Sequence, residues 1–86
     1  MAGNGALLDW YKRATAAIRS VDPNHLLIYQ GNNLAQDFWF TSTPIDSNMM
    51  LSVHDYPWLH LGQDISTRVA GYRAAAVRLN APVWVG

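Results

Sequence analysis

Three polar side chains occupy every second position near the middle of the chain: Ser52, His54 and Tyr56. Ser52 and His54 belong to an apolar run, Met49–His54, of the kind typical of a buried strand, and Tyr56 follows it. Because side chains alternate along a strand, these three should share one face while Asp55 points to the other. Polar residues at the C-terminal end of a parallel strand occupy the place where α/β enzymes bind ligands. His54 and Tyr56 are therefore the first candidates for a functional site.

The same two side chains also have a structural interpretation. A buried histidine can be held by hydrogen bonds, and a tyrosine can pack its ring in a core while its hydroxyl binds a carbonyl. The spacing alone gives neither interpretation an advantage. It predicts where His54 and Tyr56 lie, and leaves open whether they bind a ligand.

Other chemical motifs are absent or incomplete. His54, Asp55 and His60 include two kinds of zinc ligand, but Asp55 should face away from His54, and no cysteine or further histidine is nearby. The serines lack a Gly-x-Ser-x-Gly context, and the glycines match neither a P-loop nor a dinucleotide fingerprint. The sequence therefore predicts no metal site and no cofactor.

Two amphipathic segments predict helices. The first runs from about Gly5 to Ser20, where apolar residues recur at spacings of four and three. Its apolar face comprises Leu7, Tyr11, Ala14, Ile18 and Val21. The second begins at Asp64 or Ser66, either of which can cap it, and ends at Asn80. Its apolar face comprises Ile65, Val69, Tyr72, Ala76 and Leu79.

Three short apolar runs follow the pattern of strands buried on both faces. They comprise His25–Gly31, Met49–His54 and Pro82–Gly86. Asn32–Asn48 is predicted as a long loop with room for one helical turn, and Asp55–Gly62 as a second loop. The order of elements predicts an α/β fold with a parallel sheet covered by helices. The residues alone do not separate a closed barrel from an open doubly wound sheet.

Five further side chains receive structural assignments. Trp10 and Trp84 fall in a helix and a buried strand, so both are predicted to lie in the core. Arg68, Arg73 and Arg78 are predicted to cover the solvent face of the second helix.

The composition limits the classes of function. Six Lys and Arg balance six Asp, so the chain has no field suited to nucleic acid or an acidic membrane surface. Half of the residues are hydrophobic, which favours a packed interior. No apolar run could span a bilayer, and the N-terminus lacks the pattern of a signal peptide. With 86 residues and no cysteine, the chain is short for an independent core.

Four segments carry a family resemblance in their joint order. They are Met1–Asn4, the helix and turn Tyr11–Leu26, the His-x-Tyr segment Leu51–Tyr56, and Ala81–Gly86. Together they resemble family 5 glycoside hydrolases, the cellulase-like (β/α)8 barrels, from the helix after the fourth strand to the end of the seventh. The opening segment is also similar to members that act on glycolipids. The resemblance implies a partial barrel with about three parallel strands, approximately strands five to seven, and two main helices.

The resemblance also implies a reaction. The parent would be a retaining enzyme that hydrolyses β-glycosidic O-glycosyl bonds in a polysaccharide, oligosaccharide or glycolipid. Such enzymes use two carboxyls about 5–5.5 Å apart, one as acid/base and one as nucleophile. This sequence contains no glutamate, and the resemblance places the acid/base before Met1 and the nucleophile after Gly86. Residues 1–86 are thus expected to be one incomplete piece of a catalytic barrel, inactive by itself.

Four residues receive site roles by this resemblance. His54 and Tyr56 would orient the two carboxyls and contact sugar next to the cleaved bond. Trp58, in the loop after Tyr56, and Trp39, in the loop after the first strand, would offer flat rings to the apolar C–H face of a sugar. Loop aromatics also cover hydrophobic core, and that alternative stays open for both tryptophans.

Two other functions remain open. A small self-associating α/β module could bind a ligand or partner without catalysis, because three strands leave two edges and partly uncovered helix faces. An enzyme that uses His54 with Asp55 or Asp64 is a third possibility. The compartment is also open: a secreted parent is compatible with this sequence if its signal lies upstream of Met1.

Overall fold

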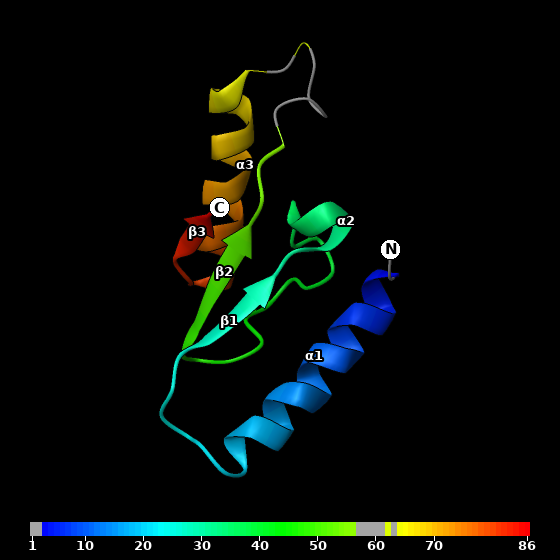
Figure 1. Cartoon of the computed structure of the whole chain (residues 1–86), viewed down its shortest axis with the longest axis vertical. Helices are drawn as coiled ribbons and strands as arrows, with labels where there is room; N and C mark the ends of the chain where they lie inside the picture. Colours follow the sequence, from blue (N-terminus) through cyan, green and yellow to red (C-terminus); the bar gives the residue numbers. More distant parts are fainter. Residues whose placement is uncertain (1–2, 57–61, 63) are drawn as a thin grey trace.

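The computed structural model describes residues 3–56, 62 and 64–86, which form six elements of an α/β fold (Figure 1). In chain order these are α1 (Asn4–Arg19), β1 (Leu27–Gln30), α2 (Asn32–Ala35), β2 (Met49–Val53), α3 (Ile65–Leu79) and β3 (Val83–Val85). The predicted order is confirmed, and α2 is the helical turn for which the long loop had room. None of the helices in these stretches has the length and apolar character needed to cross a membrane.

The three strands form one parallel sheet in the order β1-β2-β3. Leu27 of β1 lies opposite Met49 of β2, and Leu51 of β2 lies opposite Val83 of β3. Parallel neighbours need crossover connections, which are supplied here by α2 with its following loop and by α3. The C-terminal ends of all three strands therefore lie at one edge of the sheet.

The core lies between the sheet and one layer of helices. Tyr29, Leu51 and Val53 point into it and are almost fully buried, together with Leu79 of α3. The Tyr29 hydroxyl lies 2.7 Å from Thr15 Oγ1, a buried contact between β1 and α1. Both long helices thus cover the same face of the sheet.

Aromatic rings fill the space between the two long helices. Phe38 and Phe40, from the loop after α2, are buried in the core. The Phe40 ring centroid lies 5.7 Å from those of Tyr11 and Phe38, and the Tyr11 ring packs edge-on against Tyr29 at 5.1 Å. An irregular crossover with two phenylalanines therefore covers the sheet where a longer helix could have done so.

The opposite face of the sheet is open in the part of the chain that the structure describes. Ile28 is 61% exposed, Trp84 is 62% exposed, and Met50 between them is half-buried. The prediction of strands buried on both faces is therefore wrong for this chain by itself. The placement of Trp84 in the core is also wrong, as is that of Trp10, whose side of α1 is exposed. The helices form one layer, and side chains of the other parity point away from it.

The two ends of α3 are fixed by local chemistry. Asp64 caps the first turn by accepting a hydrogen bond from the Thr67 amide at 3.0 Å. Asn80 ends the helix in the left-handed conformation, with φ at 50°, which asparagine tolerates better than most residues. Both boundaries agree with the residues predicted to cap and to end this helix.

Candidate functional site

His54 and Tyr56 lie side by side where the chain leaves β2. Their rings are stacked, with centroids 6.2 Å apart and planes inclined by 25°. Both side chains are half-buried. The His54 amide donates a hydrogen bond to the Ala35 carbonyl at the end of α2, at 2.8 Å. The structure therefore brings the first two predicted site residues together at the C-terminal edge of the sheet.

Asp55, between these two residues, points into the helical layer. Its carboxylate accepts hydrogen bonds from Arg68 Nε at 2.7 Å, from Arg68 Nη2 at 3.2 Å and from the Tyr72 hydroxyl at 2.9 Å. The side chains of Arg68 and Asp55 are only 8% and 11% exposed. Burial and the contact with Asp55 raise the pKa of Tyr72 to about 12. The predicted alternation is confirmed, and Asp55 belongs to a buried cluster on the other side of the strand.

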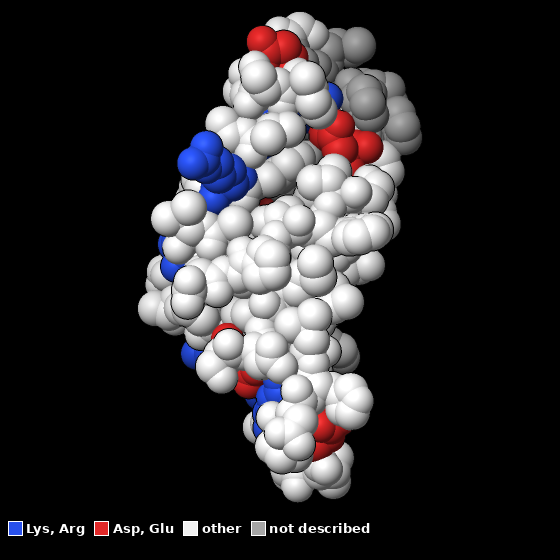
Figure 2. All heavy atoms as spheres, turned by 90° about the vertical axis from the view of Figure 1, so that its left-hand side faces the viewer, with Lys and Arg blue, Asp and Glu red and all other residues white. Residues whose placement is uncertain are grey.

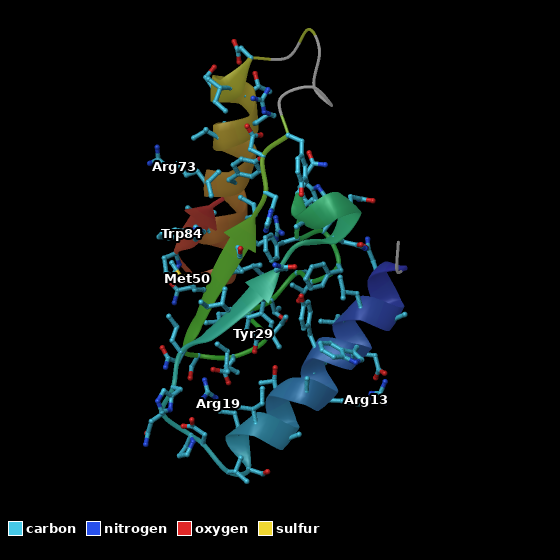
Figure 3. All side chains as sticks on the ribbon, viewed as in Figure 1. Arg13, Arg19, Tyr29, Met50, Arg73 and Trp84 are labelled. Carbon is cyan, nitrogen blue, oxygen red and sulfur yellow. The ribbon has the colours of Figure 1, made fainter. Side chains whose placement is uncertain are left out.

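The prediction that three arginines of the last helix face solvent is wrong for two of them. Arg68 turns toward the sheet, and its hydrogen bonds to Asp55 raise its pKa. Arg78 Nη2 donates to the Phe38 carbonyl at 2.8 Å. Arg73 alone of the three points away from the sheet (Figure 3). Ala75 of α3 is buried on the same side of the helix as Arg68 and Arg78. Ile65 and Val69 lie on the exposed side.

The ends of the strands meet around the pair of rings. The Gly86 amide donates to the Val53 carbonyl at 2.8 Å, and the Asp55 amide approaches the Gly86 carbonyl at 3.4 Å. On the other side, β1 leads into α2 through Gly31. A Cβ atom at Gly31 would lie 2.5 Å from the Asp37 carbonyl oxygen, so this close return of the chain requires glycine.

The α2 turn beside His54 has an unusual backbone. Asn33 and Ala35 have positive φ angles of 52° and 61°. For alanine this conformation costs about 1–3 kcal/mol and persists only where the surroundings hold it. The hydrogen bond between the His54 amide and the Ala35 carbonyl is one such restraint. The strain therefore lies directly against the candidate site.

Of the two tryptophan candidates, the structure describes only Trp39. Trp39 packs against the last turn of α3, where the Arg78 guanidinium lies 4.8 Å from its ring centroid in a cation–π contact. Its ring is 72% exposed. The structure places it on the helical side of the sheet, against α3. Trp58 lies outside the described residues, so its sugar contact stays a prediction.

Ligand sites of other kinds have little support in the described stretches. Within residues 3–56, 62 and 64–86, no group of three or more His, Cys, Asp or Glu side chains could hold a metal ion. His60, which entered the zinc interpretation, lies outside them. Two surface hollows are lined by α3 with the loop after α2, and by α1 with β1. Neither hollow includes His54 or Tyr56 among the described residues that line it.

Comparison with known proteins decides the family. A family model described as "Cellulase (glycosyl hydrolase family 5)" matches residues 2–86. The chain belongs to glycosyl hydrolase family 5. A β-xylosidase from Phanerodontia chrysosporium is 40% identical over 52 residues, which cover 58% of this chain and 11% of the β-xylosidase. No solved structure matches the chain significantly.

The family 5 barrel explains the two unequal faces of the sheet. In a (β/α)8 barrel the helices form an outer ring and side chains from the strands fill the interior. The chain is a partial barrel of three parallel strands, so its helix-covered face is the outer face. Its open face, with Ile28, Met50 and Trp84, is the inner one. The sequence pattern of doubly buried strands thus suits the complete barrel of a family 5 enzyme.

The family also gives the strand ends a meaning. Enzymes with this fold build their active sites at the C-terminal ends of the strands. His54 and Tyr56 lie at that end of β2. Sequence reasoning missed the Asp55–Arg68–Tyr72 cluster on the other side of the strand. The available signal was the spacing of four between Arg68 and Tyr72, which puts both on one side of the helix.

Proposed function

We propose that this chain is the segment between the acid/base and the nucleophile of a retaining family 5 glycoside hydrolase. The whole enzyme hydrolyses β-glycosidic O-glycosyl bonds in a polysaccharide, oligosaccharide or glycolipid. The observation that carries the proposal is the stacked His54–Tyr56 pair at the C-terminal end of β2, beside the end of β3 at Gly86. Membership in a hydrolase family supports the class of reaction.

The pair suits the needs of two catalytic carboxyls. Retaining glycosidases hold these groups about 5–5.5 Å apart and keep one protonated while the other is ionised. By the family resemblance, the acid/base precedes Met1 and the nucleophile follows Gly86. A tyrosine hydroxyl can donate to an ionised carboxylate, and an imidazole can donate or accept. We assign His54 and Tyr56 to orienting the two carboxyls and contacting sugar at the cleaved bond.

The 86 residues are expected to be inactive by themselves. The chain has no glutamate, and Asp55 and Asp64, the two aspartates considered above as partners of His54, have structural partners. Asp55 binds Arg68 and Tyr72 on the helical side, and Asp64 caps α3. Neither arrangement supports an enzyme that pairs His54 with one of these aspartates.

The first experiment compares the full-length protein that contains this segment with the 86-residue chain. We expect the full-length protein to release 4-nitrophenol from at least one member of a panel of 4-nitrophenyl β-glycosides. The chain alone should release none. A full-length protein inactive on the whole panel and on β-linked glycan and glycolipid substrates would overturn the proposal.

A pair of histidine variants tests the site in the full-length protein. His54→Ala should lower kcat/KM by at least about tenfold, since one positioned hydrogen-bonding group in an active site contributes that much or more. His25→Ala is the matched control, because its exposed imidazole lies in the turn after α1. Equal kcat/KM values for the two variants would remove His54 from the site.

The substrate panel follows from the relative and from the aromatic residues. The similarity to a β-xylosidase makes β-xylosides the first substrates to test, beside β-glucosides and a glycosylceramide. We propose that Trp58 stacks on a sugar ring near Tyr56. Trp39 would contribute only a more distant contact, because its exposed ring lies on the helical side.

A second candidate function rests on the exposed apolar surface. The side of the molecule that carries α3 and β3 shows few charged groups (Figure 2). Exposed apolar side chains of these two elements include Val69, Val77, Trp84 and Val85. A surface of this kind, with free strand edges, favours self-association of the isolated chain into a partner-binding module.

Sedimentation of the purified 86-residue chain separates the two candidates. A defined oligomer that unfolds cooperatively would favour the self-associating module. Insoluble or molten material would favour a piece of a larger barrel, because such a piece lacks the segments that cover its inner face.

A further inference from the structure

We propose that Asp55 is a positioning residue, which fixes the end of β2 so that His54 and Tyr56 project toward the catalytic carboxyls. This inference rests on the proposed glycosidase function. The Asp55 carboxylate itself points into the helical layer, toward Arg68 and Tyr72. Its effect on the reaction would pass through the backbone that it shares with its two neighbours.

The first support is the strength of the anchor. Three donor groups from α3 converge on one carboxylate, two from the Arg68 guanidinium and one from the Tyr72 hydroxyl. Two parallel bonds from arginine restrict the direction of a carboxylate as well as its distance. Because the ion pair is almost buried, water competes with it little. The side chain of Asp55 therefore has one well-defined place.

The second support is the position of this anchor in the chain. Asp55 immediately follows His54 and precedes Tyr56, so its Cα position limits the directions of both rings. The Asp55 amide also approaches the Gly86 carbonyl, and the Gly86 amide donates a hydrogen bond to the Val53 carbonyl. One residue thus joins α3, the end of β2 and the end of β3. If the nucleophile follows Gly86, the same anchor sets its separation from His54.

The third support is a contrast within the same molecule. Arg19 and Asp46 form another largely buried ion pair, with Nη2–Oδ2 at 2.8 Å and side chains 18% and 13% exposed. It joins the end of α1 to the loop before β2, at the N-terminal edge of the sheet. It has similar chemistry but no link to His54 or Tyr56. The pair therefore provides a matched control for effects that are merely structural.

The experiment measures kcat and KM for Asp55→Asn and Asp46→Asn in the full-length protein. Both variants remove one buried negative charge and keep the size of the side chain. We expect Asp55→Asn to lower kcat at least tenfold while KM changes less than threefold. Asp46→Asn should leave both constants within twofold. Equal kcat values for the two variants, or a change confined to KM in Asp55→Asn, would overturn the positioning role.

A second variant covers the case in which Asp55→Asn does not fold. Tyr72→Phe removes one hydroxyl donor and keeps both the ring and the ion pair. We expect a smaller loss of kcat, about threefold, with an unchanged KM. Where Asp55→Asn does fold, a higher kcat in Asp55→Glu than in Asp55→Asn would support a positioning effect that depends on the negative charge. An unchanged kcat in Tyr72→Phe would refute the proposal when Asp55→Asn is insoluble.

These outcomes are distinct from failure of the proposed function. If the wild-type full-length protein cleaves no β-glycoside, the glycosidase assignment fails, and with it the premise for a positioning residue. If the wild type is active, His54→Ala is impaired and Asp55→Asn behaves as Asp46→Asn does, only the role of Asp55 fails.

Discussion

The two faces of this sheet differ in what covers them. One face packs Tyr29, Leu51 and Val53 against α1, α3 and two loop phenylalanines. The other presents Ile28 and Trp84 without a covering layer in the described residues. The apolar strands of this sheet therefore have one face that packs against helices and loop residues, and one face that is left open. An apolar strand therefore indicates what covers it in the complete fold. In a segment of that fold, one of its two faces can stay uncovered.

The largest expected effect comes from truncating the covered face. Leu51→Ala should lower the free energy of unfolding by about 2–5 kcal/mol, because it leaves a cavity at a fully buried position. In the full-length protein Ile28→Ala should also lower it, by more than the roughly 0.5 kcal/mol that is usual for surface substitutions. Urea unfolding of the full-length protein measures both. A cost of Ile28→Ala within that surface limit would contradict the assignment of this face to the barrel interior.

The buried hydroxyl pair on the covered face gives the next largest effect. Tyr29→Phe leaves Thr15 Oγ1 without its 2.7 Å partner. We expect a loss of about 1–3 kcal/mol, the cost of an unsatisfied buried polar group. Thermal and urea unfolding check this value. The double variant Tyr29→Phe/Thr15→Val should recover part of the loss, and failure to recover any would show that the hydroxyls act separately.

The pH dependence of stability tests the Arg19–Asp46 ion pair, which joins α1 to the loop before β2. Hydrogen bonds from Arg19 and from the Asn48 amide hold the pKa of Asp46 below its ordinary value. Asp46 therefore contributes stability above its unfolded pKa of about 3.9, and the contribution is lost as the pH falls through its lower folded pKa. We expect Asp46→Asn to be less stable than wild type at pH 6. The gap should narrow below about pH 4; a constant gap down to pH 2 would contradict this account.

The smallest effect is expected on the outer surface of α1. Asp9 and Arg13 form an ion pair one helical turn apart, with side chains 67% and 73% exposed. Such pairs contribute about 0.3–0.5 kcal/mol and are weakened by salt. Asp9→Asn should therefore leave the urea midpoint almost unchanged at 0.5 M NaCl. A loss as large as that of Asp46→Asn would remove the distinction between exposed and buried pairs.

Much of the fold could be predicted because its signals are local. The spacing of apolar residues predicts both long helices, and the apolar runs predict all three strands. Asp64 and Asn80 mark the ends of α3 through bonds and backbone angles that involve only near neighbours. The alternation across β2 also places His54 and Tyr56 on one side and Asp55 on the other.

The predictions that failed depend on distant partners. Arg68 and Arg78 were assigned to solvent because charged residues usually lie there. Asp55 and the Phe38 carbonyl, 13 and 40 positions away, instead bring them toward the sheet. Trp39 also has a distant partner, because its ring contacts Arg78 in the last turn of α3; its role in sugar binding stays a prediction. Nothing in the local pattern selects these contacts.

The sequence by itself determined the order of elements, the parallel α/β class, the family resemblance and the two faces of β2, because periodicity and turn chemistry act over a few residues. The tertiary structure alone decided which face is covered, which arginines turn inward, and that Asp55 joins α3 to the strand ends. These outcomes require segments far apart in the chain to pack together. The candidate site depends on both. Alternation along β2 puts His54 and Tyr56 on one side of the chain, and tertiary packing brings Arg68 and Tyr72 to Asp55 on the other.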